Sequence, residues 1–453
     1  MLKIGWATRD FTPTRPAMIQ GQKHTRIGRD AADPLTLTAL ALDGGSQTQQ
    51  VVMVSFDIAM TPELLQSAVR ERLRTRLPEL PPDNLIMNAT HTHDGPVIIS
   101  GFYPHPGGDV VTPEETLAMI ADRAADAVVE AWEKRTPRLL GRAFGHAVVG
   151  HNRRAVYANG MARMYGQTND PSFSHIEGYE DHSLDMLFIW EPDGRLAGVV
   201  LDIPCPSQVA ENMESFSADY WHDVRVELRQ RFGQHLQVLP LCGAAGDQSP
   251  HFLLYGRQEE EMRRRRGLTE RQEIAVRVGD AVARALVCTT PVADGIKLLH
   301  LCKHLAFSRR PITRGERDWA AGALEDEIKQ GNPLDLWWPK MLRDVAERFD
   351  RGEAMPLCRA EIHVMRLGDA VIATSPFELY QDYGLQIKAR SPATQTLIVQ
   401  LAGGSGLYLP TARAVAGGHY GAHPAVAPVG PEGGRELVEA TLAAIGEVFS
   451  AAI

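Results

Sequence analysis

The sequence predicts an α/β protein, a layered domain built around mixed sheets. Short apolar runs of strand length alternate with longer stretches of helical spacing over most of the chain. The segment Glu191-Pro-Asp-Gly194 separates two apolar runs and predicts a β-hairpin. No internal repeat or low-complexity linker interrupts the pattern. We therefore expect a single domain over residues 1–453.

The expected elements follow in chain order. They are strands at 35–42 and 51–56, a helix at 62–76, a strand at 85–89, a helix at 113–133, strands at 186–190 and 197–202, a helix at 218–232, a strand at 238–241, a charged helical stretch at 259–286, strands at 359–366, 370–374 and 396–401, and a helix at 435–449. The helix at 113–133 has the clearest start, because Thr112 suits the N-cap and Pro113 suits the first turn. Glu114 and Glu115 favour its positive end.

Residues 308–353 differ in character from the rest of the chain. They are charged, have helical spacing, are broken at Gly331-Asn-Pro333 and contain Trp337-Trp338. We expect a helical insertion here. It would be a lid over a site, an interface arm, or a solvated excursion with buried tryptophans.

Composition limits the class of protein. The chain has 453 residues, 44% apolar and 23% charged, which is typical of a globular protein. A net charge of −9 argues against nucleic acid as a partner, and no run approaches the roughly 18 apolar residues of a transmembrane segment. The N-terminus has no apolar signal region, and the five cysteines are few and odd in number. We therefore expect a cytoplasmic protein with reduced thiols.

The stretch from Asn88 to Pro96 is the most informative one. His91 and His93 follow an apolar run, two residues apart, and a Gly-Pro pair comes next. On an extended backbone this spacing points both imidazoles to one side, at the end of a strand where α/β proteins gather functional groups. The pair could share a metal, or one ring could bind metal while the other moves a proton. Alternatively, both rings are bonded to backbone.

Other polar residues also fall just past apolar strands. They are Asp57, Cys205, Asp247, Glu378 and Tyr408. If the strand ends converge, these side chains and the two histidines form a cluster of nitrogen, oxygen and sulfur donors, which are zinc ligands. Zinc with an open position lowers the pKa of a bound water and polarises a carbonyl, which suits hydrolysis of an amide or ester.

These residues give the chain a resemblance to the neutral (alkaline, non-lysosomal) ceramidases. Asn88 to Pro96 matches the family's double-histidine motif except for Asp94, where the family has serine. Further similar segments keep the family's order: Ile4 to Pro13, Val54 to Ile58, Asn152-Arg153, Gly246 to Pro250, Pro376 to Leu379, Tyr408 to Thr411 and Tyr420 to Ala422. The resemblance covers nearly the whole chain and implies the family's catalytic domain, here without its immunoglobulin-like C-terminal domain.

The resemblance implies one zinc ion and names its ligands. His91, Glu378 and Tyr408 fall on three of the family's ligands. The family's second histidine falls on Cys205, whose thiolate is also a good zinc ligand. Cys205 is alternatively a small buried cysteine, and His222 is then the substitute donor.

The resemblance also implies catalytic roles. His93 would move a proton or bind the developing oxyanion beside the metal. Arg153 would hold an oxygen of the substrate, because a guanidinium cannot act as a base. Ser249 matches a serine that the family treats as catalytic, and we interpret it as a positioning hydroxyl or a turn residue.

The expected function is that of a zinc-dependent hydrolase that cleaves an amide bond by metal-activated water. The expected partner is a small-molecule substrate, an N-acyl compound. A small polar or sugar-derived amide or ester is an alternative. A zinc-dependent lyase or isomerase would use the same ligands. A non-catalytic metal-binding relative is the third possibility, although the joint presence of His91, His93, Glu378 and Tyr408 speaks against it.

Overall fold

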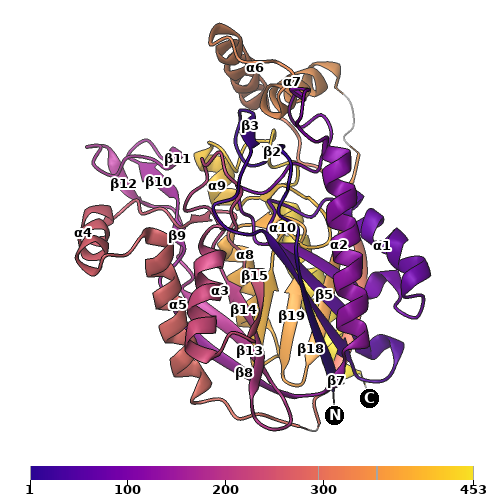
Figure 1. Ribbon diagram of the computed structural model, residues 1–453. Helices are drawn as coiled ribbons and strands as arrows, with labels where there is room; N and C mark the ends of the chain where they lie inside the picture. The colour runs from indigo at the N-terminus through magenta and orange to yellow at the C-terminus, as the bar shows by residue number, and fades with distance from the viewer. Residues whose placement is uncertain (1, 294, 353–355, 452–453) are drawn as a thin grey trace.

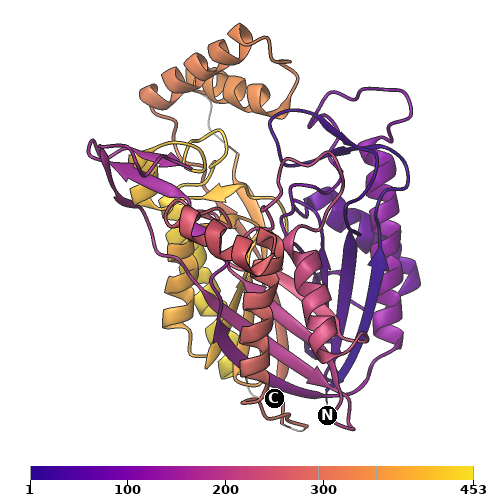
Figure 2. The same ribbon diagram turned by 60° about the vertical axis from the view of Figure 1, so that its left-hand side comes forward.

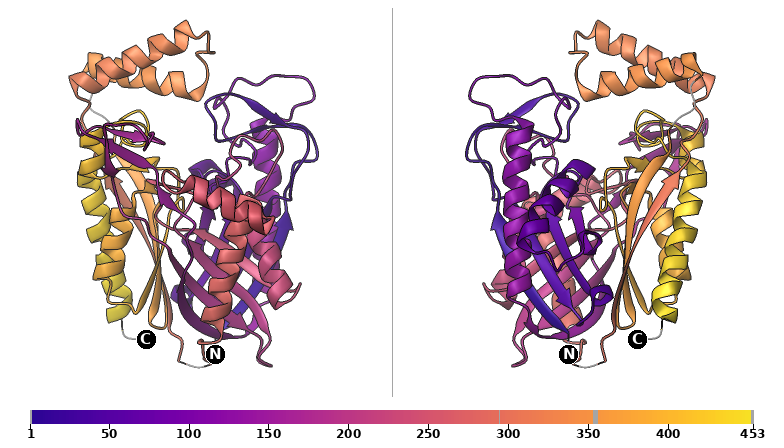
Figure 3. Two further views of the ribbon diagram at one scale, coloured as in Figure 1. Left: turned by 90° about the vertical axis from the view of Figure 1, so that its left-hand side faces the viewer. Right: turned by 90° about the vertical axis from the view of Figure 1, so that its right-hand side faces the viewer.

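The computed structural model describes residues 2–293, 295–352 and 356–451, with helices packed outside mixed sheets (Figures 1 and 3). The first sheet has the strand order β6-β5-β4-β1-β7. Its strands are β1 (Lys3–Asp10), β4 (Thr36–Asp43), β5 (Gln50–Phe56), β6 (Leu85–Ala89) and β7 (Thr136–Pro137). β5 and β6 are parallel, whereas β1, β4 and β5 are antiparallel. α1 (Glu63–Arg76) and α2 (Pro113–Glu133) cover the outer face.

The second sheet has the order β15-β14-β13-β8. It consists of β8 (Leu139–His146), β13 (Ser183–Trp190), β14 (Leu196–Ile203) and β15 (Gln237–Cys242). β13 and β14 form the predicted hairpin, and β15 lies parallel to β14. α3 (Tyr220–Phe232) and α5 (Glu270–Leu286) pack on this sheet.

The helical stretch expected at 259–286 is two helices. α4 (Gly256–Arg266) ends at Gly267, whose φ of 67° lies in the left-handed region. Glycine adopts this conformation without steric cost and commonly ends helices. Thr269 then starts α5 with a capping box to Gln272.

The third sheet has the order β17-β18-β19-β21. Its strands are β17 (Leu298–Phe307), β18 (Cys358–Leu367), β19 (Ala370–Thr374) and β21 (Gln395–Val399). α8 (Gln381–Arg390) and α10 (Pro431–Ser450) cover its outer face (Figure 3). The predicted layered α/β fold with mixed sheets is confirmed.

One apolar core joins the three sheets. It contains Ile4 and Leu40 from the first sheet, Val200 from the second, and Ile372 and Leu397 from the third, each at most 1% exposed. Complete burial of such a side chain stabilises the fold by about 1.5–3 kcal/mol. This shared core fixes the positions of the strand ends relative to one another. It therefore also fixes where the loops that follow the strands begin.

Short elements gather at the end of the molecule opposite the chain termini (Figure 1). They are β2 (Ala17–Ile19), β3 (Arg26–Gly28), β9 (His151–Asn152), β10 (Arg154–Tyr157), β11 (Ala162–Met164), β12 (Phe173–Ile176), β16 (Gln248–Ser249), β20 (Glu378–Leu379), β22 (Tyr408–Leu409) and α9 (Ala412–Gly417). Two 3-10 turns, η1 (Gln47–Gln49) and η2 (Pro82–Asn84), lie in the first sheet's connections.

The expected insertion at 308–353 contains a helical hairpin formed by α6 (Arg314–Lys329) and α7 (Trp337–Arg351). Residue 353 itself lies outside the described residues. The hairpin stands above the sheets at the same end as the short elements (Figure 2). The Trp337 indole donates to the Gln22 carbonyl at 3.0 Å and stacks on Phe102 with ring centroids 5.5 Å apart. No helix among the described residues is both long and apolar enough to cross a membrane.

Candidate active site

His91 lies in the loop that follows β6 and has an unusual backbone. Its φ of 64° is left-handed, not extended as the spacing predicts. Side chains with a Cβ rarely adopt this conformation, and such residues cluster at functional sites. Nδ1 contacts the Ala59 carbonyl, which leaves Nε2 3.2 Å from Glu378 Oε2. The rings of His91 and His93 nevertheless lie near each other, with centroids 5.1 Å apart.

Glu378 and Tyr408 are brought together by strand pairing. β20 and β22 are parallel, with Glu378 directly opposite Tyr408 in the register. Burial alone would raise the pKa of Glu378, but His91 and the hydrogen bond with Tyr408 outweigh it and lower the pKa. Arg153 donates to the Tyr408 hydroxyl at 3.1 Å and to the Gly246 carbonyl at 2.9 Å. The site therefore holds an ionised carboxylate between an imidazole and a phenol.

This arrangement fits a divalent metal ion. Two ligands of one tetrahedral zinc ion, each about 2.0–2.2 Å from it, lie about 3.3–3.6 Å apart. The His91 and Glu378 donor atoms are 3.2 Å apart, and their side chains are only 5% and 9% exposed. Imidazole, carboxylate and phenolate from His91, Glu378 and Tyr408, which all line the cavity, would hold the ion.

Cys205 lies elsewhere. It is fully buried in the apolar core that also contains Tyr220 and Trp221. Burial, with a smaller effect of Cys242, raises the pKa of its thiol. Among the described residues, the Cys205 sulfur, the His91 nitrogens and the Glu378 oxygens do not form a group whose donor atoms all lie within 4.8 Å of one another. Neither Cys205 nor His222 lines the cavity that His91, Glu378 and Tyr408 line, and Cys205 as a ligand stays a prediction.

His93 faces a different set of partners. Its Nδ1 lies 3.2 Å from Glu211 Oε2, and its Nε2 lies 2.8 Å from the Gln208 amide nitrogen. Burial lowers the pKa of His93, although Glu211 opposes the shift, so the ring is neutral near pH 7. The other oxygen of Glu211 lies 3.4 Å from His251 Nε2. His93 is therefore a neutral imidazole beside a carboxylate.

Asp94 supports the loop that carries His93. Its carboxylate accepts a hydrogen bond of 2.8 Å from Arg26, and both side chains are at most 3% exposed. Arg26 also donates to the His93 carbonyl. Burial raises the pKa of Asp94 to about 7 despite the Arg26 contact. Asp94, at the position where the neutral ceramidase motif has serine, therefore forms a buried ion pair with Arg26.

Ser249 is buried and does not line the cavity. It accepts hydrogen bonds of 3.1 Å from the Tyr165 hydroxyl and from the His251 amide. Tyr165 lines the cavity, so Ser249 contacts the cavity wall only through another residue. Its role as a positioning hydroxyl stays a prediction.

The site opens into a cavity of about 770 Å³. Five predicted residues line it: His91, His93, Arg153, Glu378 and Tyr408. Sequence reasoning missed Gln208, Glu211, Tyr165 and Lys23, which also line it. Gln208 and Glu211 follow the end of β14, so the same strand-end rule could have found them, whereas Lys23 has no such signal.

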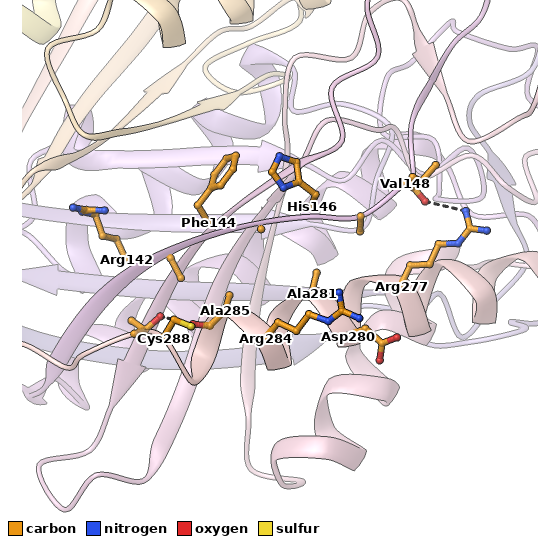
Figure 4. Close-up of a pocket in the computed structure, with 14 residues that line it drawn as sticks. Arg142, Phe144, His146, Val148, Arg277, Asp280, Ala281, Arg284, Ala285 and Cys288 are labelled. Carbon is orange, nitrogen blue, oxygen red and sulfur yellow. Dashed lines mark hydrogen bonds between the residues drawn. The ribbon is translucent and has the colours of Figure 1, made fainter.

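A second cavity of about 760 Å³ lies between β8 and α5 (Figure 4). Arg142, Phe144 and His146 from β8 face Arg277 and Arg284 from α5. None of the predicted site residues lines this second cavity.

Comparisons with known proteins bear on the fold. No protein-family model matches the chain, and no curated protein matches it by sequence. Among solved structures, the neutral ceramidase from Pseudomonas aeruginosa is similar, with a TM-score of 0.71 and 16% identity over 98% of this chain and 75% of that one. A ceramidase complexed with C2 gives a TM-score of 0.70 and 15% identity over 100% and 77%. The predicted resemblance is confirmed at the level of architecture: this chain has the fold of a neutral ceramidase.

Proposed function

We propose that the protein is a metal-dependent hydrolase, an amidohydrolase that cleaves a small N-acyl compound. The observation that carries the proposal is the convergence of His91, Glu378 and Tyr408 in a cavity that also contains His93 and Arg153. The neutral ceramidase fold supports it. We propose zinc as the ion, because it accepts nitrogen and oxygen ligands in tetrahedral sites. Bound there, zinc would polarise the substrate carbonyl and lower the pKa of a water molecule.

The protein's own residues then have distinct tasks. The Arg153 guanidinium, fixed by the Gly246 carbonyl and Tyr408, would hold the oxygen that becomes negative as the carbonyl is attacked. His93, oriented by Glu211, would accept a proton from water and return it to the leaving nitrogen. Ser249 would keep Tyr165 in place against the substrate.

The cavity walls support a substrate with an apolar part. Ile99, Phe102, Trp337 and Met341 line the side formed with the helical hairpin. We propose that this hairpin acts as a lid over an acyl group. Burial of four such side chains by a ligand excludes water from the reacting bond.

A polar or sugar-derived substrate is the second candidate, and Lys23 favours it. Lys23 lines the cavity, and its ammonium lies 3.9 Å from the centre of the Trp338 ring and 5.3 Å from that of Tyr420. Burial lowers the pKa of Lys23, although Glu327 opposes this shift. A polar group on the substrate would bind this cation. We also propose a cytoplasmic location, which the five free cysteines support.

The test uses the zinc-loaded protein, a panel of substrates and water labelled with oxygen-18. The panel contains a long-chain N-acyl amino alcohol, an N-acyl amino acid, an N-acetylated sugar and an ester. We expect cleavage of at least one amide, with one labelled oxygen in the released acid. Product without label would favour a lyase or isomerase, and a zinc-loaded protein that converts none of the panel would favour a non-catalytic relative.

A further inference from the structure

A second group of metal-binding side chains lies outside the cavity. Asp83, Cys302, His304 and Glu361 have donor atoms that all lie within 4.8 Å of one another. Cys302 and His304 are two apart on β17, so they share a face, and Glu361 on β18 is directly opposite His304. Asp83 comes from η2. None of the four lines the cavity that contains His91.

The distances within this group suit one ion. Cys302 Sγ lies 3.9 Å from His304 Nε2, and that nitrogen lies 3.9 Å from Asp83 Oδ2. Ligands around a tetrahedral zinc, with bonds of about 2.3 Å to sulfur and about 2.0–2.1 Å to nitrogen and oxygen, lie about 3.3–3.7 Å apart. These two pairs would need to close by about 0.2–0.6 Å, and the remaining pairs, which lie within 4.8 Å, would close around the ion with them.

Neighbouring residues hold the Glu361 carboxylate in place. Arg70 donates to its two oxygens at 3.0 and 2.6 Å, and His363 Nε2 lies 2.9 Å from Oε1. His363 Nδ1 in turn lies 3.1 Å from His300 Nε2. Outer hydrogen bonds of this kind orient metal-ligating carboxylates. Oε1 accepts from both Arg70 and His363, whereas Oε2 accepts only from Arg70 and keeps a lone pair for an ion.

The exposure of the group gives an ion access. The side chains of His304 and Asp83 are 66% and 58% exposed, whereas that of Glu361 is 10% exposed. The exposed pair can therefore close around an ion that has reached the more buried carboxylate and thiol.

We propose that Asp83, Cys302, His304 and Glu361 form a second metal site that binds zinc. A thiolate combined with an imidazole and carboxylates is a donor set for zinc, and four protein ligands without an open position are typical of a structural ion. η2 leads into β6 at the edge of the first sheet, and β17 is the edge of the third. The ion would cross-link these two sheet edges.

The test is cobalt substitution, because a thiolate ligand gives cobalt(II) a charge-transfer absorption band. We expect the band in the wild-type protein and in Cys205→Ser, and we expect its loss in Cys302→Ser and in His304→Ala. Loss in Cys205→Ser with retention in Cys302→Ser would overturn the proposal and assign the thiolate to residue 205. A cobalt-loaded wild-type protein without the band would also overturn it. Circular dichroism of each variant checks that it has folded.

Zinc stoichiometry separates this site from the proposed active site. We expect two zinc ions per chain in the wild type and one in Cys302→Ser, which should still hydrolyse the amide substrate. Zinc should raise the thermal midpoint of a His91→Ala variant but raise that of the Cys302→Ser, His91→Ala double variant far less. A wild type with one zinc ion that His91→Ala loses and Cys302→Ser keeps would overturn the second site and leave the proposed function intact.

Discussion

Removal of the His93 side chain is expected to stop turnover and leave the metal in place. The two motif histidines have separate partners, because Nε2 of His91 faces Glu378 whereas His93 contacts Glu211 and Gln208. A positioned acid or base contributes about 10²–10⁴-fold to rate. At about 1.36 kcal/mol per tenfold, His93→Ala should raise the activation barrier by about 3–5 kcal/mol.

The assay measures kcat, KM and zinc content of His93→Ala with the best amide of the substrate panel. His251→Ala is the matched control, because it removes a histidine from the other oxygen of Glu211 without opening the cavity. We expect the control to lower kcat by less than about tenfold. KM should change little in His93→Ala, since the lost interaction is made in the transition state.

Two results would refute this reasoning. If His93→Ala loses zinc as completely as His91→Ala, then His93 is a ligand and the division of roles is wrong. If His251→Ala lowers kcat as much as His93→Ala, the effect comes from the Glu211 network as a whole and not from the imidazole that faces the cavity.

Three further predictions concern the metal, the pH dependence and the fold. His91→Ala and Glu378→Ala should each lower zinc occupancy of the active site and abolish turnover, as metal analysis and kinetics would record. Glu211→Gln removes the carboxylate that raises the pKa of His93, so the acidic limb of the kcat/KM profile should move to lower pH. Arg225→Ala leaves the buried Asp57 carboxylate without its bidentate partner and should lower the free energy of unfolding in urea by about 3–5 kcal/mol.

The pH and stability predictions each have a control on the same molecule. Glu214→Gln changes an exposed carboxylate three residues from Glu211, and its pH profile should match that of the wild type. A shift of the limb to higher pH in Glu211→Gln would contradict the assigned sign. Arg265→Ala breaks an exposed pair and should cost about 1 kcal/mol or less. Zinc retained at full occupancy by Glu378→Ala would exclude this carboxylate as a ligand.

Part of the site follows from the rule that polar residues after apolar strands converge. Glu378 and Tyr408 are separated by thirty residues in the sequence and are brought together in another way, because each is the first residue of a short strand and the two strands pair. His91 lies past the end of β6, where the rule places it. Its left-handed backbone was not predictable from the spacing, because a turn fixed by the Ile58 and Ala59 carbonyls sets it.

Cys205 illustrates what sequence reasoning could not supply. Matching it to a ligand position assumes that its side chain points to the site. The strand β14 ends at Ile203, however, and the chain then bends, with the Cys205 amide donating to the Ile203 carbonyl at 2.7 Å. Cys205 therefore lies in the core, whereas Gln208, three residues later, lines the cavity. The break at Gly267 could have been predicted from the sequence. A glycine that ends a helix is followed by Thr269 and Gln272, which form the capping box of the next helix.

The helical hairpin of α6 and α7 interrupts a pair of adjacent strands. β17 and β18 pair along their whole length, and the last residue of one, Phe307, lies opposite the first residue of the other, Cys358. The two ends of the inserted segment are therefore held together by the sheet itself, and closing a longer or shorter loop there changes the entropy only slowly with length. Evolution or engineering can thus exchange this segment as a module, and in its proposed role as a lid this would alter which molecules are admitted, while the sheets and the proposed site below stay as they are.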